Sequence, residues 1–197
     1  EDNFYFKWKY FLLRFLNIKL NNEAQRNYWQ YQNNLDFMKK ENYCLESPSH
    51  KKLWNEITRN VNFKGLFGYD YGCGGGVFSE LIAKQGANVI GVDYAKNKNY
   101  EHTEIIEDIT KFIPEKKADF INCCRVLSHI EYWKQDLTLQ QIKRNLKDKG
   151  FIILLESERG ESSNGHYRDW NNCLMFYGFK IKRFLSDGIM HCILAEK

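Results

Sequence analysis

From residue 65 onward, short apolar runs alternate with segments in which apolar side chains recur every three or four positions. The runs 66–71 and 88–93 each have the length of one strand, and the segment 77–85 between them places Leu81 and Ile82 on one helical face. Such alternation is typical of βα units that build a parallel sheet. We expect seven strands, at 66–71, 88–93, 104–106, 119–123, 151–156, 179–184 and 190–195.

Capping and turn residues predict where the helices of this region begin and end. The first helix covers 77–85, and Gly86 ends it because glycine readily takes the left-handed conformation of a helix cap. The second begins near Thr138, since Thr138 and Gln141 have the spacing of a capping box. The expected helices are therefore 77–85, Thr138 to Gly150, and 169–177.

The N-terminal part has a different, helical pattern. Within 1–20, aromatic residues such as Trp8 and Phe11 share one helical face and basic residues lie on the other. We expect this helix to pack on the domain; a helix at a membrane surface is an alternative that we do not favour, and a lid or a dimer contact is another. Residues 21–60 are polar and helical in pattern, with an interruption at Pro48. We divide the chain into a helical N-terminal extension or cap, 1–60, and a core, 61–197.

The composition is that of a soluble globular domain. Of the 197 residues, 43% are hydrophobic and 27% are charged, and the formal net charge of +4 is only mildly basic. This charge permits an anionic substrate, but the chain has no dense basic run, so a nucleic acid partner is not expected. The six cysteines include no C-x-x-C pair, so we expect no metal site and a reduced, cytoplasmic protein. No apolar run reaches the ~20 residues of a membrane span.

The segment DYGCGGG, residues 70–76, lies between an expected strand and an expected helix. Glycines there allow a sharp turn and the close approach of a ligand to the main chain. The dinucleotide fingerprint G-x-G-x-x-G does not fit, because its third glycine would fall on Val77 or Ser79. No lysine follows at the position that a P-loop requires. The segment therefore matches neither the dinucleotide fingerprint nor a P-loop.

Asp70-x-Gly72-x-Gly74-x-Gly76 resembles the first motif of the class I S-adenosyl-L-methionine (SAM)-dependent methyltransferases. SAM carries an ammonium, a carboxylate and a sulfonium but no phosphate, so an acidic residue at the loop suits its cationic end. The resemblance covers about residues 60–197. It implies a Rossmann-like α/β fold, in which a seven-stranded, mostly parallel sheet with an antiparallel last strand carries helices on both faces. It also implies SAM as the cofactor and S-adenosyl-L-homocysteine as the product.

Further segments occur in the order of that family's motifs. Asp93 ends the second expected strand, where a carboxylate can accept hydrogen bonds from both ribose hydroxyls. The resemblance places Asp108 against the adenine amino group and the segment 118–130 beside the methionine part of SAM. The expected cofactor-binding residues are Asp70, Tyr71, Gly72, Cys73, Gly74, Gly76, Asp93, Tyr94, Asp108, Ile109, Cys124 and Arg125.

Two further segments, 94–103 and 28–31, can be compared with the corresponding segments of that family. Residues 94–103 are short and rich in lysine and asparagine where the family usually has a helix, so we expect that helix to be missing or reduced to a turn. The aromatic segment 28–31 resembles one that covers SAM or the substrate in many small-molecule members, and ordinary helix packing is the alternative.

Methyl transfer to a hydroxyl usually needs a base beside the reacting atoms, although the sulfonium already activates the leaving group. Ligands of open α/β sheets bind beyond the carboxyl ends of the strands. His129 and His166, in the loops after the fourth and fifth expected strands, are therefore the candidate catalytic residues, with a structural role as the alternative for each. We expect His50 and His102 on the surface and His191 in the last strand. The candidate contacts to an anionic substrate are Arg125, Lys134, Arg159 and Arg168.

Together these residues predict an enzyme that transfers a methyl group from SAM to a small-molecule acceptor. No N/D-P-P-Y/F sequence follows the fourth expected strand, which argues against methylation of exocyclic amines of DNA. A hydroxyl of a sugar, a glycan precursor or another metabolite is favoured instead. RNA or protein methylation is one alternative, and a non-catalytic SAM-binding domain or partner subunit, motivated by the short segment 94–103, is the other. The sequence does not predict an oligomeric state.

Overall fold

The computed structural model describes residues 48–96, 102–158 and 166–197. The expected helix at 1–20, its membrane, lid and dimer alternatives, and the aromatic segment 28–31 all lie outside these residues. The division of the chain at residue 60 stays a prediction. Among the residues that are described, no helix combines the length and apolar character needed to cross a membrane.

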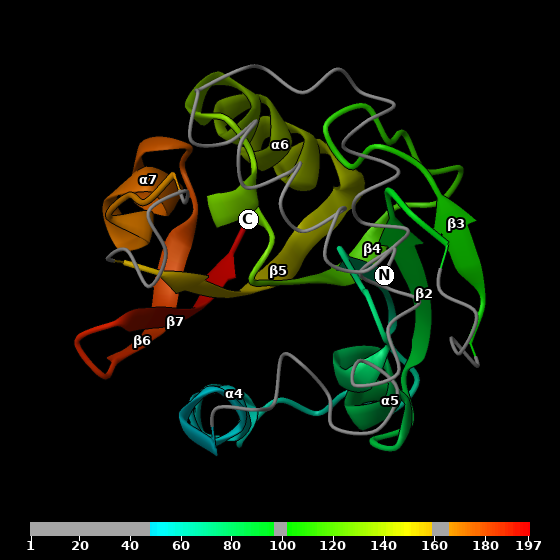
Figure 1. The fold of residues 1–197 in the computed structure, drawn as a ribbon. Coiled ribbons are helices and arrows are strands. Elements are labelled where there is room, and N and C mark those ends of the chain that lie inside the picture. Colours follow the sequence, from blue (N-terminus) through cyan, green and yellow to red (C-terminus); the bar gives the residue numbers. More distant parts are fainter. Residues whose placement is uncertain (1–47, 97–101, 159–165) are drawn as a thin grey trace, which may run out of the picture.

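Seven strands form one sheet in the order β3-β2-β1-β4-β5-β7-β6 (Figure 1). β1 pairs in parallel with β2 and β4, and parallel pairing continues outward to β3 and β5. β7 is antiparallel to both β5 and β6. This arrangement confirms the expected Rossmann-like α/β fold with its mostly parallel sheet. The strands are β1 (Phe67–Tyr71), β2 (Asn88–Asp93), β3 (Glu104–Ile106), β4 (Ala118–Cys124), β5 (Leu146–Ser157), β6 (Lys180–Ser186) and β7 (Met190–Glu196).

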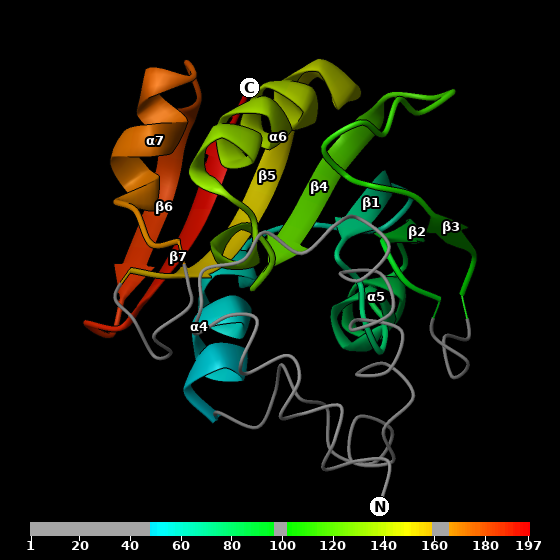
Figure 2. The same ribbon diagram turned by 45° about the horizontal axis from the view of Figure 1, so that its top comes forward.

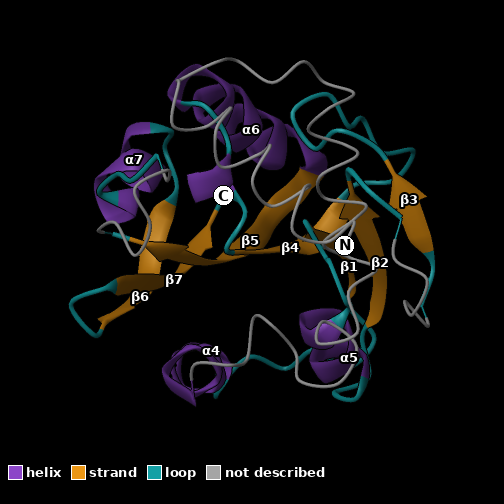
Figure 3. Ribbon diagram, viewed as in Figure 1, coloured by secondary structure: helices purple, strands orange, loops and turns teal. Residues whose placement is uncertain are grey.

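Helices cover both faces of this sheet, as expected. The described helices are α4 (Pro48–Thr58), α5 (Val77–Ala83), α6 (Tyr132–Asn145) and α7 (Trp170–Phe176), with a short 3-10 helix, η2 (Leu127–His129). α4 and α5 lie on one face, and α6 and α7 lie on the other (Figures 1 and 3). The core under α4 and α5 includes Trp54 and Phe120, whereas the core under α6 and α7 includes Tyr69 and Trp170. The central strands β1 and β4 are therefore buried on both faces, whereas the edge strand β6 alternates between exposed and half-buried positions.

The helix expected from Thr138 to Gly150 has different bounds. α6 begins at Tyr132 and ends at Asn145, so both the expected start and the expected end are wrong. The Thr138 hydroxyl lies inside the helix and donates to the main-chain oxygen of Lys134 at 2.8 Å. A threonine hydroxyl can be satisfied by the preceding helical turn as well as at a cap, which is why its spacing to Gln141 was misleading.

β5 starts earlier than the apolar pattern predicted, at Leu146, directly after α6. Its register against β4 shifts between Ala118 and Phe120, and Lys149 has a φ of 62°. Gly150 lies in this irregular start of the strand, where a Cβ would come within 2.9 Å of a main-chain oxygen. Gly150 therefore permits a close main-chain contact within β5 and does not end a helix.

The carboxyl ends of the parallel strands meet along one edge of the sheet. Tyr71 at the end of β1 lies beside Val92 on β2 and beside Cys123 on β4. Cys123 in turn lies beside Leu154 on β5. Figure 2 shows β1, β4 and β5 running side by side. The segments that leave these strands therefore start close together, at the edge where open α/β sheets bind their ligands.

Candidate cofactor-binding site

The loop after β1 passes through three glycines in the left-handed region. Gly72, Gly74 and Gly76 have φ angles of 65°, 48° and 80°. At Gly72 a side chain is also excluded by packing, because a Cβ there would come 2.2 Å from a methyl group of Val126. Gly76 directly precedes α5. The motif thus forms the tight main-chain loop between strand and helix that the sequence predicted.

Asp93, the last residue of β2, joins this loop to the neighbouring strand. One of its carboxylate oxygens accepts the N–H of Gly74 at 2.9 Å, and the other accepts the N–H of Ala95 at 3.0 Å. Burial raises the pKa of the Asp93 carboxyl group above its usual value. Each oxygen of an ionised carboxylate has a further lone pair, so both can still accept a ribose hydroxyl.

Asp70 has a more internal position than the sequence suggested. It is only 2% exposed, and its oxygens accept the Ser79 hydroxyl at 2.5 Å and the Asn122 side-chain amide at 2.7 Å. Asn122 in turn accepts the indole N–H of Trp54 at 3.0 Å. Burial, with a smaller effect of the nearby Asp93 carboxylate, raises the pKa of Asp70 to about 6. The Asp70 carboxylate therefore links β1 to α5 and β4, and its direct contact with SAM stays a prediction.

Three other expected site residues near the loop are buried. The Tyr71 side chain lies in the core against α6, and its hydroxyl accepts the side-chain N–H of Asn145 at 2.8 Å. The Tyr71 side chain is therefore directed into the core, and a contact of Tyr71 with the cofactor stays a prediction. Cys73 and Cys124 are both less than a tenth exposed, and the Cys124 thiol donates to Asn122 at 3.4 Å.

The expected adenine-side residues follow β2 and β3, which are neighbouring strands. One oxygen of Asp108 accepts both the main-chain N–H and the hydroxyl of Thr110, at 2.9 and 2.7 Å, so it stabilises a local turn. Ile109 is buried in the core, and Tyr94 is half-buried directly after Asp93. The described parts of the segment 94–103, at 94–96 and 102–103, contain no helix, and the loss of a helix across the whole segment stays a prediction. The contact of these residues with adenine stays a prediction.

The turn after β4 carries a backbone conformation that the sequence did not reveal. Arg125 has a φ of 58°, which is costly for a residue with a side chain, and its N–H donates to the oxygen of Leu155 on β5 at 2.7 Å. The chain then turns into η2 immediately beside Gly72. A strained residue held firmly at the carboxyl edge is typical of a functional site.

Glu156, near the end of β5, holds this turn and was not among the expected site residues. It is fully buried, and its carboxylate accepts three main-chain N–H groups, those of Val126 at 2.5 Å, Leu127 at 2.6 Å and Ser128 at 3.2 Å. Burial raises the pKa of Glu156 to about 7. Its signal in the sequence is a charged residue directly after the apolar run 151–155.

The structure brings together the segments that carry the two candidate catalytic histidines. The N–H of His166 donates to the oxygen of Ser128, the residue before His129, at 2.8 Å. The Gln135 side chain donates to the oxygen of His166 at 2.8 Å, and the ring of Tyr132 meets the His166 ring edge-on with centroids 4.9 Å apart. His129 is exposed and His166 is half-buried. The two segments therefore meet in one region beyond β4 and β5.

His50 lies inside the protein, so the expectation that it is a surface residue is wrong. It is 2% exposed on α4, and its Nδ1 atom lies 3.4 Å from Nη1 of Arg125. His50 is buried because α4, which carries it, packs on the sheet through Trp54, which is 1% exposed. His102, by contrast, is half-buried.

Two of the candidate contacts to an anionic substrate have acidic partners. Arg168 forms an ion pair with Asp136 on α6, and Lys134 forms one with Glu131 at 3.1 Å. Arg159 lies outside the described residues. The remaining candidate, Arg125, lies directly after β4, and its side chain is next to His50.

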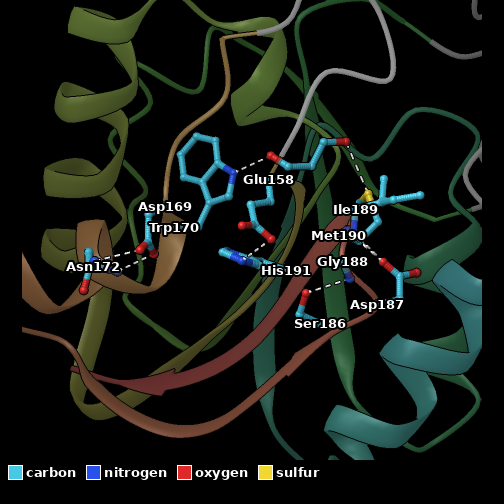
Figure 4. A network of polar contacts seen from close by, with 11 residues as sticks. Glu158, Asp169, Trp170, Asn172, Ser186, Asp187, Gly188, Ile189, Met190 and His191 are labelled. Atoms are coloured by element: carbon cyan, nitrogen blue, oxygen red, sulfur yellow. Dashed lines mark hydrogen bonds and ion pairs between the residues drawn. The ribbon is translucent and has the colours of Figure 1, made fainter.

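A second polar network lies where β5 ends and β7 begins (Figure 4). Nε2 of His191 lies 2.9 Å from a carboxylate oxygen of Glu158, while Nδ1 of His191 is buried without a hydrogen-bond partner among the described residues. The indole N–H of Trp170 donates to the oxygen of Ser157 at 2.9 Å. His191 is directly opposite Glu156 in the antiparallel pairing. This network fixes the β6–β7 hairpin to the carboxyl edge of β5.

The fold and this edge together define the class of protein. A mostly parallel sheet in this strand order, with a glycine loop after β1 and an acid at the end of β2, is that of the class I SAM-dependent methyltransferases. A family model described as a methyltransferase domain matches residues 52–190. The chain therefore belongs to this methyltransferase family, whose cofactor is SAM.

Known proteins similar to this chain have related names. A ubiquinone biosynthesis O-methyltransferase of Coxiella burnetii is 35% identical over 89 residues, which cover 38% of this chain and 37% of that protein. The same enzyme of Glaesserella parasuis is 32% identical over 115 residues, 48% of each chain. The matches thus span less than half the length of these relatives. The magnesium protoporphyrin IX methyltransferase of Synechocystis PCC 6803, solved with bound SAM, has a TM-score of 0.68 at 17% identity and covers 91% of this chain and 99% of its own.

Proposed function

We propose that this chain is an enzyme that transfers the methyl group of SAM to a hydroxyl of a small-molecule acceptor. The observation that carries the proposal is the hydrogen bond between the Gly74 N–H and the Asp93 carboxylate, which joins the glycine loop to the tip of β2 at 2.9 Å. The loop fits a ligand that approaches the main chain, since its left-handed glycines carry no side chains. When bound, SAM supplies a methyl group already activated by a sulfonium.

Each part of the cofactor has candidate partners along the carboxyl edge. Asp93 would accept hydrogen bonds from the ribose hydroxyls. Asp108, two residues after β3, would accept a hydrogen bond from the adenine amino group. The main chain of the glycine loop, with Arg125 at the tip of β4, would hold the amino acid part. In this arrangement the protein chiefly orients the reacting atoms and excludes water, which suits an in-line displacement.

The relatives named O-methyltransferases favour a hydroxyl acceptor, and we propose a sugar, a glycan precursor or another small metabolite. The acceptor oxygen would attack the methyl carbon while its proton passes to an imidazole, and the sulfonium would leave as a thioether. His129 and His166 are the candidate proton acceptors, because their segments meet beyond β4 and β5. A cytoplasmic location, predicted from the cysteine content, remains part of this proposal.

Calorimetric titration with SAM and with S-adenosylhomocysteine tests the cofactor part of the proposal. We expect both to bind, and the absence of binding by either at millimolar concentration would refute it. A methyl-transfer assay with radiolabelled SAM against a panel of sugars, hydroxylated aromatic compounds and amines then tests the acceptor class. Transfer to amines alone would overturn the hydroxyl assignment.

A SAM-binding domain without catalytic activity is the second candidate. The observation that favours it is the short segment 94–103, whose described parts contain no helix. This candidate predicts binding of SAM without turnover across the acceptor panel, whereas the enzyme predicts methylated product with at least one acceptor.

A further inference from the structure

Glu156 is a carboxylate that the proposed reaction does not use, yet its position is unusual. It is 0% exposed, and it accepts the N–H groups of three consecutive residues, Val126, Leu127 and Ser128. Burying a carboxylate is costly unless hydrogen bonds compensate, and donors to both oxygens favour its ionised form. The buried Glu156 carboxylate therefore fixes the position of the 126–128 turn.

That turn forms part of the wall of the candidate cofactor site. It follows Arg125, whose φ of 58° redirects the chain at the tip of β4. Val126 is packed so tightly against the glycine loop that a Cβ on Gly72 would lie 2.2 Å from its methyl group. A shift of Val126 would therefore be transmitted directly to Gly72. Glu156, which holds the Val126 N–H at 2.5 Å, thus sets the spacing between the β4 turn and the glycine loop.

The surroundings of Glu156 decide when its carboxylate is ionised. Burial raises the pKa of Glu156 to about 7, while the hydrogen bonds from the turn and from the Ser128 side chain oppose that rise. His191 lies opposite it on β7, the Cys123 thiol faces it from β4, and Asp70 lies further along the sheet on β1. Since Asp70 is also acidic, it adds no compensating positive charge. The carboxylate can therefore change its ionisation between pH 6 and 8.

We propose that Glu156 is a positioning residue of the cofactor site, whose ionised carboxylate holds the 126–128 turn in the form that accepts SAM. The proposal rests on the proposed function, since it assumes that SAM occupies the edge between the β1 loop and the β4 turn. When Glu156 is protonated, one of its oxygens carries a proton that faces the N–H groups of the turn. The turn then loses part of the hydrogen bonding that fixes it. Binding of the cofactor is then linked to the release of a proton from Glu156.

Titration calorimetry with S-adenosylhomocysteine at pH 6 and pH 8 tests this linkage without any acceptor. For a group with a pKa near 7, the ionised fraction rises about tenfold over this interval, so the wild-type affinity should rise by up to about tenfold. In the Glu156→Gln variant we expect weaker binding at pH 8 and a rise of less than about threefold, the part that Asp70 contributes. Asp148→Asn, at a 99% exposed side chain on the same strand, is the control, and it should keep the wild-type pH dependence.

Wild-type protein provides a second measurement in case Glu156→Gln does not fold, which thermal melting would reveal. Calorimetry at pH 7 in two buffers of different ionisation enthalpy should show the release of about half a proton on binding. Wild-type affinity and pH dependence in a folded Glu156→Gln variant, or no proton release from the wild type, would overturn the proposal. A wild-type protein that binds no S-adenosylhomocysteine at either pH would instead refute the proposed function itself.

Discussion

Trp54 on α4 donates its indole N–H to the Asn122 side chain on β4 at 3.0 Å, across 68 residues of sequence. The Asn122 side-chain N–H in turn donates to the Asp70 carboxylate at 2.7 Å. One asparagine thus joins the first described helix to the strand that begins the glycine loop. A buried chain of this kind is favourable only while every member keeps its partner.

Replacing Asn122 by alanine should therefore be strongly destabilising. The change leaves the Trp54 indole and one Asp70 oxygen buried without their partner, and we expect a loss of about 2–4 kcal/mol in the free energy of unfolding. Urea denaturation at pH 8 measures it. Trp54→Phe removes a single donor and should cost less. Equal losses for the two variants would contradict a role of Asn122 as the link.

Stability should also depend on pH through Glu156. Its pKa in the folded protein is about 7, raised from 4.5. The folded state therefore binds more protons than the unfolded state between these values, and stability is lost as the pH rises through 7. Near pH 6, a rise of one pH unit should lower the free energy of unfolding by about 1.4 kcal/mol through this one group.

The comparison of wild type with Glu156→Gln isolates this contribution, because Asp70 and Asp93 are present in both. Urea denaturation at pH 5.5, 6.5 and 8 should give a steeper decline for the wild type than for the variant. Parallel declines would mean that Glu156 is not protonated in the folded state. A carboxylate whose ionised form reduces stability at pH 8 is consistent with a role in function rather than in stability.

Asp93→Ala should weaken binding of SAM by on the order of 1–3 kcal/mol, because ribose hydroxyls would lose their acceptor. That loss is equivalent to about 5- to 150-fold in the dissociation constant measured by calorimetry. Asp148→Ala is a suitable control, since the Asp148 side chain is 99% exposed. An unchanged dissociation constant for Asp93→Ala would refute the placement of the ribose.

The parts of the site that could be predicted from the sequence are those with a local signature. The glycine loop and the acid at the end of β2 are short motifs tied to the ends of strands, and their joining through Gly74 and Asp93 follows from parallel pairing. Glu156 has no such signature. Its role appears only when β5 pairs beside β4, so that the acid meets a turn 28 to 30 residues away.

The errors have the same origin. Thr138 has the local spacing of a helix start, but the preceding residues from Tyr132 continue the helix and the hydroxyl bonds backward to Lys134. His50 lies in a polar stretch, but docking of α4 through Trp54 buries it. In each case a contact that is distant along the chain, or an unrecognised helix turn, overrode a local pattern.

The packing of Gly72 against Val126 allows a test by compensation. Gly72→Ala should severely weaken binding of S-adenosylhomocysteine, because the new Cβ would lie 2.2 and 2.8 Å from the two Val126 methyl groups. Val126→Ala in the same chain removes both methyl groups and leaves the Val126 Cβ at 3.1 Å. The double variant should recover much of the binding, although the left-handed φ still costs about 1–2 kcal/mol. A double variant no better than Gly72→Ala would show that strain alone causes the loss.

The choice between His129 and His166 as the proton acceptor can be made by comparing turnover with binding. Removing a general base typically lowers kcat by about 10²–10⁴-fold. We expect His129→Ala or His166→Ala to do so with an acceptor identified from the panel, while the affinity for SAM changes by less than about threefold. The His166 variant needs the closer structural check, because the His166 ring contacts Tyr132. Tyr132→Phe, which keeps that ring contact, is its matched control. If both histidine variants retain wild-type kcat at pH 7, neither imidazole takes the proton, and the pair of His191 on β7 and Glu158 directly after β5 becomes the next residue pair to substitute.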